Sequence, residues 1–202
     1  MVDTIIDFLR HGEPMGTSTY RGNGVDDPLS EKGWLQMWNA VGNDCPWGLI
    51  YCSPLSRCRS FADALGKKHL IHVKVDNRIK EVGFGSWEGR KRLEIQSNNP
   101  EEYEAFYRDP VNHRPAGAES LTDFENRVSA AFEDMKKTFS ARHILVVAHA
   151  GVIRAMMMYI SEKSAVEVYG TKVNNASFTR FRHTESGTKL EFYNRRTLCG
   201  SI

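Results

Sequence analysis

The sequence predicts an α/β protein whose central sheet is mostly parallel and covered by helices on both faces. The order of the apolar segments leads to this fold class. Short apolar segments of strand length alternate with longer segments whose apolar residues recur at helical spacing. The composition runs without a break along all 202 residues, which favours one domain over two. Strands that alternate with helices favour a parallel sheet, because each crossover helix packs on a face of the sheet.

Three strands and two helices are expected in the N-terminal part of the chain. Residues 4–9 form a short apolar run that predicts a buried strand, and Gly12 and Pro14 follow soon after it. A helix is expected from Ser30 to about Val41, with a periodic apolar face of Trp34, Met37, Trp38 and Val41. The other elements expected here are a strand at Leu49–Cys52, a helix over about Leu55–Lys68 and a strand at His72–Val75.

The rest of the chain is expected to add helices, one more parallel strand and a hairpin. Ile79–Arg90 is rich in glycine and aromatic residues and predicts an ordered loop. Further along are helical pieces in Leu93–Asp109, a connection at Pro110–Gly117, a helix from a Ser120 cap to about Phe139, a strand at His143–Ala148, a helix at Val152–Ile160 and a hairpin of Asn175–Arg182 and Lys189–Tyr193. We expect a single domain over residues 1–202, with a helical and loop insertion at about 90–120.

Composition and charge exclude several classes of protein. The net charge of +2 lacks the basic excess of a nucleic-acid binder. The four cysteines form no Cys-x-x-Cys pair and have no zinc-like spacing with histidines, so we expect free thiols, no metal and no cofactor. The start of the chain does not resemble a secretory signal, and no apolar run is long enough to span a bilayer. These features predict a cytoplasmic protein whose partners are neither nucleic acids nor membranes.

Basic side chains follow three of the expected parallel strands. Arg10 and His11 follow the first strand, Arg57 follows the second, and His149 follows the strand at 143–148. Ligands of such sheets bind beyond the carboxyl ends of the strands, where these residues would meet. Guanidinium groups match phosphate oxygens, and the helix start after His149 would favour an anion. The sequence therefore predicts a site for a phosphoryl group.

The residues around these positions resemble the histidine phosphatase superfamily, which includes the cofactor-dependent phosphoglycerate mutases. Six motifs occur in the family's order between residue 4 and about residue 160, namely Phe8-Leu9-Arg10-His11-Gly12-Glu13, Asp27-Pro28-Leu29-Ser30-Glu31-Lys32-Gly33, Ser53-Pro54-Leu55-Ser56-Arg57-Cys58, Glu81-Val82-Gly83-Phe84-Gly85-Ser86-Trp87-Glu88-Gly89, Gly117-Ala118-Glu119-Ser120-Leu121 and Val147-Ala148-His149-Ala150-Gly151-Val152-Ile153-Arg154. The resemblance implies a phosphoglycerate mutase-like fold.

The resemblance also implies catalytic roles. His11 would attack phosphorus and carry the phosphoryl group as phosphohistidine, while Glu81 would protonate the leaving oxygen and then activate water. The residues expected to hold the nonbridging oxygens are Arg10, Arg57 and His149.

Three further residues are predicted to bind substrate. Arg21 lies in a loop where relatives often contact phosphate or substrate, and Ala150 follows His149 in the segment that leads into the next helix. Glu88 could either support the substrate pocket or scaffold its loop. The triplet Arg90-Lys91-Arg92 could meet a second acidic group on a substrate or form a solvated helix start. Pro14 and Gly16 depart from the mutases, which place a phosphate-contacting Asn in this loop, so Ser18 and Asn23 are alternatives.

Hydrolysis is favoured over two alternatives, a bisphosphoglycerate-dependent phosphoglycerate mutase and a binding module for a phosphorylated ligand. The stretch between Glu81 and His149 is shorter than in glycolytic mutases, and every expected catalytic residue is present. Short members with Arg-His-Gly-Glu-Pro resemble the bacterial alpha-ribazole phosphatases, so alpha-ribazole phosphate is one candidate substrate. Sugar phosphates are another, and specificity should lie in the loops at about 13–25 and 90–120.

Overall fold

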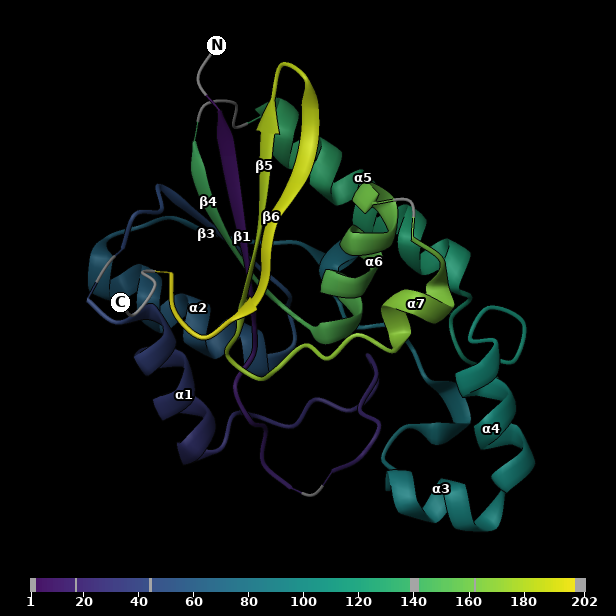
Figure 1. The fold of residues 1–202 in the computed structure, drawn as a ribbon. Helices are drawn as coiled ribbons and strands as arrows, with labels where there is room; N and C mark the ends of the chain where they lie inside the picture. The colour runs from purple at the N-terminus through teal and green to yellow at the C-terminus, as the bar shows by residue number, and fades with distance from the viewer. Residues whose placement is uncertain (1–2, 17, 44, 139–141, 162, 199–202) are drawn as a thin grey trace.

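The fold is seen in a computed structural model that describes residues 3–16, 18–43, 45–138, 142–161 and 163–198 (Figure 1). These residues contain a six-stranded sheet with the order β3-β2-β4-β1-β5-β6. The strands are β1 (Thr4–Arg10), β2 (Leu49–Cys52), β3 (Val73–Val75), β4 (His143–Ala148), β5 (Phe178–Thr184) and β6 (Gly187–Arg195). Strands β3, β2, β4 and β1 are parallel, whereas β5 pairs antiparallel with β1 and β6 with β5. The predicted fold class is confirmed.

The register of the two central strands positions the first part of the site. Strands β1 and β4 pair in parallel, and their last paired residues are Arg10 and Ala148. The next residues, His11 and His149, therefore leave the sheet at the same edge. The backbone N–H of His11 still donates to the carbonyl oxygen of Ala148 at 3.0 Å, which continues the strand pairing by one more hydrogen bond.

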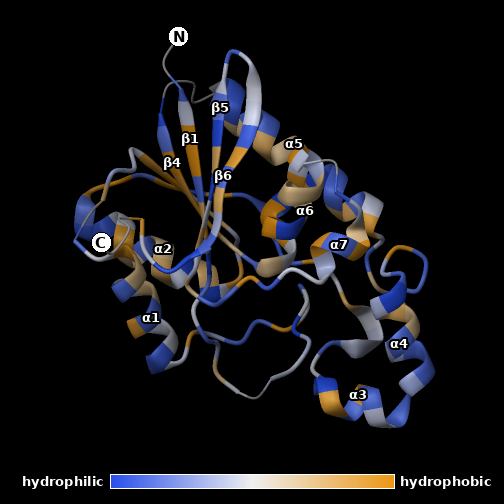
Figure 2. Cartoon of the chain, in the orientation of Figure 1, coloured by the Kyte–Doolittle hydropathy of each residue, from blue (hydrophilic) through white to orange (hydrophobic). Residues whose placement is uncertain are grey.

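Helices cover both faces of the sheet. They are α1 (Glu31–Val41), α2 (Ser56–His69), α3 (Arg92–Asn98), α4 (Pro100–Arg108), α5 (Leu121–Thr138), α6 (Ala150–Ser161) and α7 (Ala165–Tyr169). One apolar core joins a face of β1 and β4 to α5 and α6, and the other joins the opposite face to α1 and α2. Figure 2 shows hydrophobic residues along the central strands, as expected for strands buried on both faces.

The expected insertion at about 90–120 has a small core of its own. Helices α3 and α4 lie beside the sheet, away from its strands, in Figure 1. Their buried residues Ile95, Tyr103 and Phe106 pack around the fully buried Trp87, whose indole N–H donates to Glu102 Oε1 at 2.9 Å. Trp87 thus ties the glycine-rich loop before the insertion to the insertion itself.

Several local expectations differ from the structure. The loop predicted at 79–90 contains a short 3-10 helix, Gly85–Trp87, and a second one, Asn77–Ile79, precedes it. Helix α7 was not predicted, although Ser164 and Glu167 form a complete capping box there. The helix expected to reach about Phe139 is described to Thr138, and Phe139 lies outside the described residues.

The first strand of the predicted hairpin starts later than the expected Asn175, at Phe178. The reason is that the preceding residues bond to the end of β1 instead of to a strand. Asn175 Nδ2 donates to the carbonyl oxygen of His11 at 3.1 Å, and the Ala176 N–H donates to the carbonyl oxygen of Arg10 at 3.1 Å. This segment is therefore attached to the backbone of Arg10 and His11 before the chain enters the sheet.

A buried carboxylate stabilises the end of the sheet away from the site. Asp7 on β1 is fully buried and accepts hydrogen bonds from Trp47 at 2.9 Å, His143 Nε2 at 2.7 Å and Arg180 Nε at 2.7 Å. Burial acts to raise the pKa of Asp7, but the hydrogen bonds from His143 and Arg180 outweigh it and hold the pKa below its usual value. The ionised carboxylate thus ties β1 to β4 and β5.

Replacing Asp7 by Asn should lower the free energy of unfolding by about 3–5 kcal/mol near neutral pH, because the pair between the buried Asp7 and Arg180 would be broken and Arg180 would keep only its 3.9 Å contact with Glu191. Since the pKa is lower in the folded state, the contribution of Asp7 is complete above the unfolded value of about 3.9 and is lost as the pH falls below it. Urea unfolding as a function of pH measures both effects. Asp63→Asn, which removes an exposed pair with Arg59, is the control, with an expected change of about 0.5 kcal/mol. Equal effects of the two variants would contradict this role of Asp7.

Candidate active site

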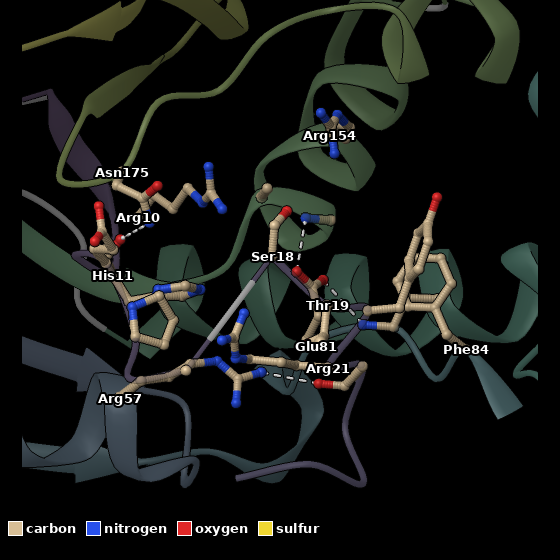
Figure 3. Close-up of a pocket in the computed structure, with 18 of the residues that line it drawn as sticks. Arg10, His11, Ser18, Thr19, Arg21, Arg57, Glu81, Phe84, Arg154 and Asn175 are labelled. Atoms are coloured by element: carbon tan, nitrogen blue, oxygen red, sulfur yellow. Dashed lines mark hydrogen bonds between the residues drawn. The ribbon is translucent and has the colours of Figure 1, made fainter. Parts of the chain in front are cut away.

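A cavity of about 510 Å³ lies beyond the carboxyl ends of β1, β2 and β4. Its lining includes six of the residues predicted from the sequence, namely Arg10, His11, Arg21, Arg57, Glu81 and Ala150. Figure 3 shows Arg10, His11 and Arg57 together on one side of this cavity and Phe84 on the other. His149 and Glu88 are not among its lining residues.

The hydrogen bonds of His11 define which ring nitrogen is available. Its Nδ1 lies 2.7 Å from the carbonyl oxygen of Gly12. Because a carbonyl can only accept, Nδ1 carries the proton of the neutral imidazole, and Nε2 keeps its lone pair. Gly12 has no room for a side chain, since a Cβ there would lie 2.2 Å from the carbonyl oxygen of Gly33. The segment after β1 is thereby packed closely against the start of α1.

The surroundings of His11 favour the neutral imidazole. Burial, followed by the charges of Arg10 and Arg57, holds its pKa well below the usual histidine range. The side chain is 5% exposed and lines the cavity. His11 is therefore a neutral imidazole next to two cations.

The two arginines are held by backbone carbonyl groups. Arg10 donates to Val173 O at 2.6 Å, and Arg57 donates to Val25 O and Gly22 O at 2.9 Å each. Burial lowers the pKa of Arg10 to about 10, the Glu81 carboxylate opposes this, and Arg154 and Arg57 reinforce it. These bonds fix the guanidinium groups without neutralising them.

Both arginines also keep a buried donor without a partner. Among the described residues, the Nε–H groups of Arg10 and Arg57 are buried and have no hydrogen-bond acceptor. An unpaired buried donor costs roughly 1–3 kcal/mol, more when the group is charged. Since both residues line the cavity, their positive charges make the site complementary to an anion with several oxygens, such as a phosphoryl group.

Glu81 lines the same cavity as His11, and its carboxylate lies against the start of α6. Its Oε2 accepts from the Gly151 N–H at 3.3 Å and its Oε1 accepts from the Val82 N–H at 3.0 Å. A Cβ on residue 151 would lie 2.1 Å from Glu81 Oε1. Glycine at position 151 is therefore what allows the carboxylate to sit against the helix N-terminus.

The backbone that carries Glu81 is held by Arg127 of helix α5. Arg127 donates to the carbonyl oxygens of Arg78, Lys80 and Glu81 at 2.6, 2.9 and 3.1 Å. It also forms a two-pronged pair with Glu119, at 2.6 and 2.8 Å. Arg127 is a positioning residue that motif matching did not find, because it contacts the site only through the backbone.

His149 lies behind the cavity lining. It is fully buried, its ring lies 5.3 Å from that of His11 with the planes at 63°, and its Nε2 is 2.8 Å from Ser53 Oγ. Burial and then the charge of Arg57 hold its pKa well below the usual range. Cys58, expected to be a buried small residue, is fully buried, and burial raises the pKa of its thiol, which lies 3.6 Å from His149 Nε2.

Two charged residues, Arg21 and Glu88, hold the loop that follows His11. Arg21 donates to Asp27 Oδ2 at 2.8 Å and to Met15 O at 2.7 Å, and it lines the cavity. Glu88 Oε1 accepts from the backbone N–H groups of Asn23 at 3.2 Å and Phe84 at 2.9 Å. Glu88 therefore occupies the scaffolding position. Of the two alternatives for a phosphate contact, Ser18 lines the cavity and Asn23 does not.

The sequence analysis missed several lining residues as site residues, among them Asn175, Tyr169 and Arg154. Asn175 anchors the segment before β5 to the backbone of His11, and Tyr169 comes from the unpredicted helix α7. Arg154 lies one turn into α6, at the end of a motif that was recognised. Arg154 could have been predicted as a site residue, because it lies four residues after the start of a helix that begins at the site. The other two come from elements distant in the sequence.

The described residues were compared with the requirements of a metal site and of a membrane-spanning helix. They contain no group of three or more His, Cys, Asp or Glu residues arranged to hold a metal ion. Within the same residues, no helix is both long and apolar enough to cross a membrane.

Comparison with known proteins gives a consistent result. The model of the histidine phosphatase superfamily (branch 1) matches residues 6–196. Phosphoserine phosphatase 1 of Hydrogenobacter thermophilus is 27% identical over 176 residues, covering 85% of this chain and 83% of that protein. Adenosylcobalamin/alpha-ribazole phosphatase of Salmonella typhimurium is 24% identical over 195 residues, covering 95% of this chain and 96% of that protein.

A solved structure is similar over nearly the whole chain. The native mycobacterial glucosyl-3-phosphoglycerate phosphatase superposes with a TM-score of 0.84 at 25% identity, covering 96% of this chain and 99% of that one.

The neutral state of His11 can be tested directly. At about pH 6, below the usual histidine pKa of about 6.5, the ring should still be neutral with its proton on Nδ1. Two-bond ¹H–¹⁵N spectra recorded between about pH 8 and about pH 6 measure this, with His11→Gln used to assign the signals. Ring nitrogen shifts typical of an imidazolium at about pH 6 would contradict the assignment.

Proposed function

This chain belongs to the histidine phosphatase superfamily, and on that premise we propose that it hydrolyses phosphomonoesters of small metabolites through a phosphohistidine at His11. The observation that carries the proposal is the state of His11. Its imidazole is neutral with Nε2 unprotonated, and His11 lines the cavity together with Arg10 and Arg57. A nucleophile and the charge that stabilises its transition state are thus assembled together.

In the first step His11 Nε2 attacks phosphorus in line with the departing oxygen. The P–N bond forms and the P–O bond to the alcohol breaks. Arg10 and Arg57 stabilise the nonbridging oxygens, because their fixed positive charges need no reorganisation as negative charge shifts. Glu81 gives its proton to the leaving alkoxide, and the negative charge of the bound substrate favours the protonated carboxyl beforehand.

In the second step water replaces His11. The carboxylate of Glu81 takes a proton from water as the oxygen attacks phosphorus, the P–N bond breaks, and inorganic phosphate leaves. Both steps need Glu81 on the side of the phosphoryl group opposite the nucleophile, and the bond from the Gly151 N–H fixes its carboxylate at the start of α6. His149 packs edge-on against His11 and maintains its ring orientation.

The three site residues outside this cycle have supporting roles in the proposal. Arg21 brings a further positive charge to the cavity, and Ala150 lines its wall at the start of α6. Glu88 holds the loop that carries Arg21.

Phosphatase activity is supported over the mutase alternative by the relatives, which are named as phosphatases of phosphoserine, alpha-ribazole and glucosyl-3-phosphoglycerate esters. These three leaving groups differ widely, so alpha-ribazole phosphate stays one candidate among several. A silent binding module would not require the paired nucleophile and proton donor that this cavity contains.

The wild-type protein should release phosphate from p-nitrophenyl phosphate in the presence of EDTA, since none of the proposed steps uses a metal. His11→Ala should reduce kcat by at least about a thousandfold, because the covalent route is lost. His72→Ala, which changes an exposed histidine outside the cavity, is the matched control and should keep wild-type activity.

The same assay should include alpha-ribazole phosphate, phosphoserine and 3-phosphoglycerate. Activity that disappears with EDTA, or that survives in His11→Ala, would rule out the proposed chemistry. Isotope exchange between phosphoglycerates, primed by bisphosphoglycerate and without phosphate release, would favour the mutase instead.

Gly151→Ala tests the placement of Glu81. The added Cβ would displace the carboxylate that it meets at 2.1 Å, so proton donation should suffer while His11 stays in place. General acid catalysis contributes roughly 10²–10⁴-fold, so kcat for an alkyl phosphate should fall at least tenfold more than kcat for p-nitrophenyl phosphate, whose leaving group needs no proton. In Gly48→Ala the added Cβ meets nothing within 4 Å, and both rates should be unchanged. Equal losses on both esters would contradict the assigned role.

A further inference from the structure

A second cavity, of about 420 Å³, adjoins the active-site cavity. The two share four lining residues, namely Tyr20, Phe84, Arg154 and Tyr169. The second cavity extends to the insertion and to the segment after α7, and its remaining lining residues are Arg92, Phe106, Tyr107, Gly170, Thr171 and Lys172. A leaving group that departs from the phosphoryl site along this shared wall would enter the second cavity.

The second cavity is positively charged. Arg92, Arg154 and Lys172 line it, and no lining residue carries a carboxylate. Within the described residues, no ion pair involves any of these three side chains. Three cations from α3, α6 and the segment after α7 therefore face one cavity without a neutralising partner, although the chain as a whole has a net charge of only +2.

Aromatic rings hold the two arginines in place without removing their charge. The Arg92 guanidinium lies 4.9 Å from the ring centre of Tyr107, and its Nε donates to the hydroxyl of Tyr103. The Arg154 guanidinium lies 5.7 Å from the ring centre of Tyr169, and its Nε and one terminal nitrogen donate to Thr171 O at 3.3 and 3.0 Å. Since a guanidinium has five N–H donors, each arginine keeps several for a ligand.

The neighbouring cation Arg90 is a useful contrast. It pairs with Glu94 at 3.1 Å and does not line the cavity. The residues of the basic triplet at 90–92 therefore differ in their surroundings. Arg90 is neutralised by Glu94, whereas Arg92 lines the second cavity.

We propose that the second cavity binds a second acidic group, carried by the leaving group of the phosphomonoester substrate. A carboxylate or a phosphonate-like oxyanion would accept hydrogen bonds from Arg154 and Arg92, with Lys172 adding charge at the rim, and the body of the leaving group would pack on the rings of Tyr20 and Phe84. This inference rests on the proposed function, since it assigns the substrate class of the same site.

The test compares matched phosphomonoesters of straight-chain alcohols that end in a carboxylate, a phosphonate or a neutral primary amide, over a series of chain lengths. The distant end group leaves the reactivity of the ester unchanged. At the optimal length, wild-type kcat/KM should be at least about tenfold higher for an acidic end than for the amide. Arg154→Gln and Arg92→Gln should each remove most of this ratio, and Arg90→Gln should keep both the ratio and the activity.

Calorimetry with His11→Ala measures the affinity of the same compounds without turnover. It therefore tests the second cavity separately from hydrolysis. Tighter binding of the acidic compounds, abolished by adding Arg154→Gln, would support the inference even if hydrolysis were absent and the proposed function failed. Hydrolysis of all end groups at equal rates, or an acidic preference that survives Arg154→Gln and Arg92→Gln, would overturn the inference and leave the proposed function standing. A preference for the phosphonate alone would identify the second group as a phosphate.

Discussion

The site depends on burying guanidinium charge without giving it carboxylate partners of equal strength. Arg57 is 1% exposed, yet its nearest carboxylate oxygen in an ion pair, on Asp26, is 3.9 Å away. Its firm hydrogen bonds go to backbone carbonyl groups, as does that of Arg10. Burying charge in this way lowers the stability of the fold. In return, the positive charge stays available to an incoming phosphoryl group.

Other features of the site follow from this arrangement. The carbonyls that receive the arginines belong to the loop after β1 and to the segment before β5, so the same bonds that orient the charges close these loops over the cavity. Burial, followed by the charges of Arg10 and Arg57, also keeps the His11 imidazole neutral. Glu81, whose charge acts on Arg10, is held by backbone N–H groups. At the opposite end of the sheet the buried charge has close partners of opposite charge. Asp7 is paired there with Arg180 and His143, and these pairs stabilise the fold.

The sequence predicted those parts of the structure that depend on local pattern and chain direction. Arg10, His11 and Arg57 could be placed together because parallel strands end at one edge of a sheet, and the motif around Glu81 identified it as a cavity residue. Arg127, Asn175 and Tyr169 were not found, since each reaches the site by packing between elements far apart in the sequence. Local sequence pattern could not predict the second cavity either. Arg92 and Arg154 face the same space only after α7 and the insertion have folded together.

The most direct test of this account is to trap the covalent intermediate. Wild-type protein mixed with a fast-reacting phosphomonoester and quenched in alkali within milliseconds should carry phosphate that is stable to alkali and labile to acid. Peptide mass spectrometry should locate it on His11, and its formation should precede the steady release of inorganic phosphate. Phosphate on another residue, or turnover of the ester with no phosphorylated protein at any time after mixing, would contradict the account.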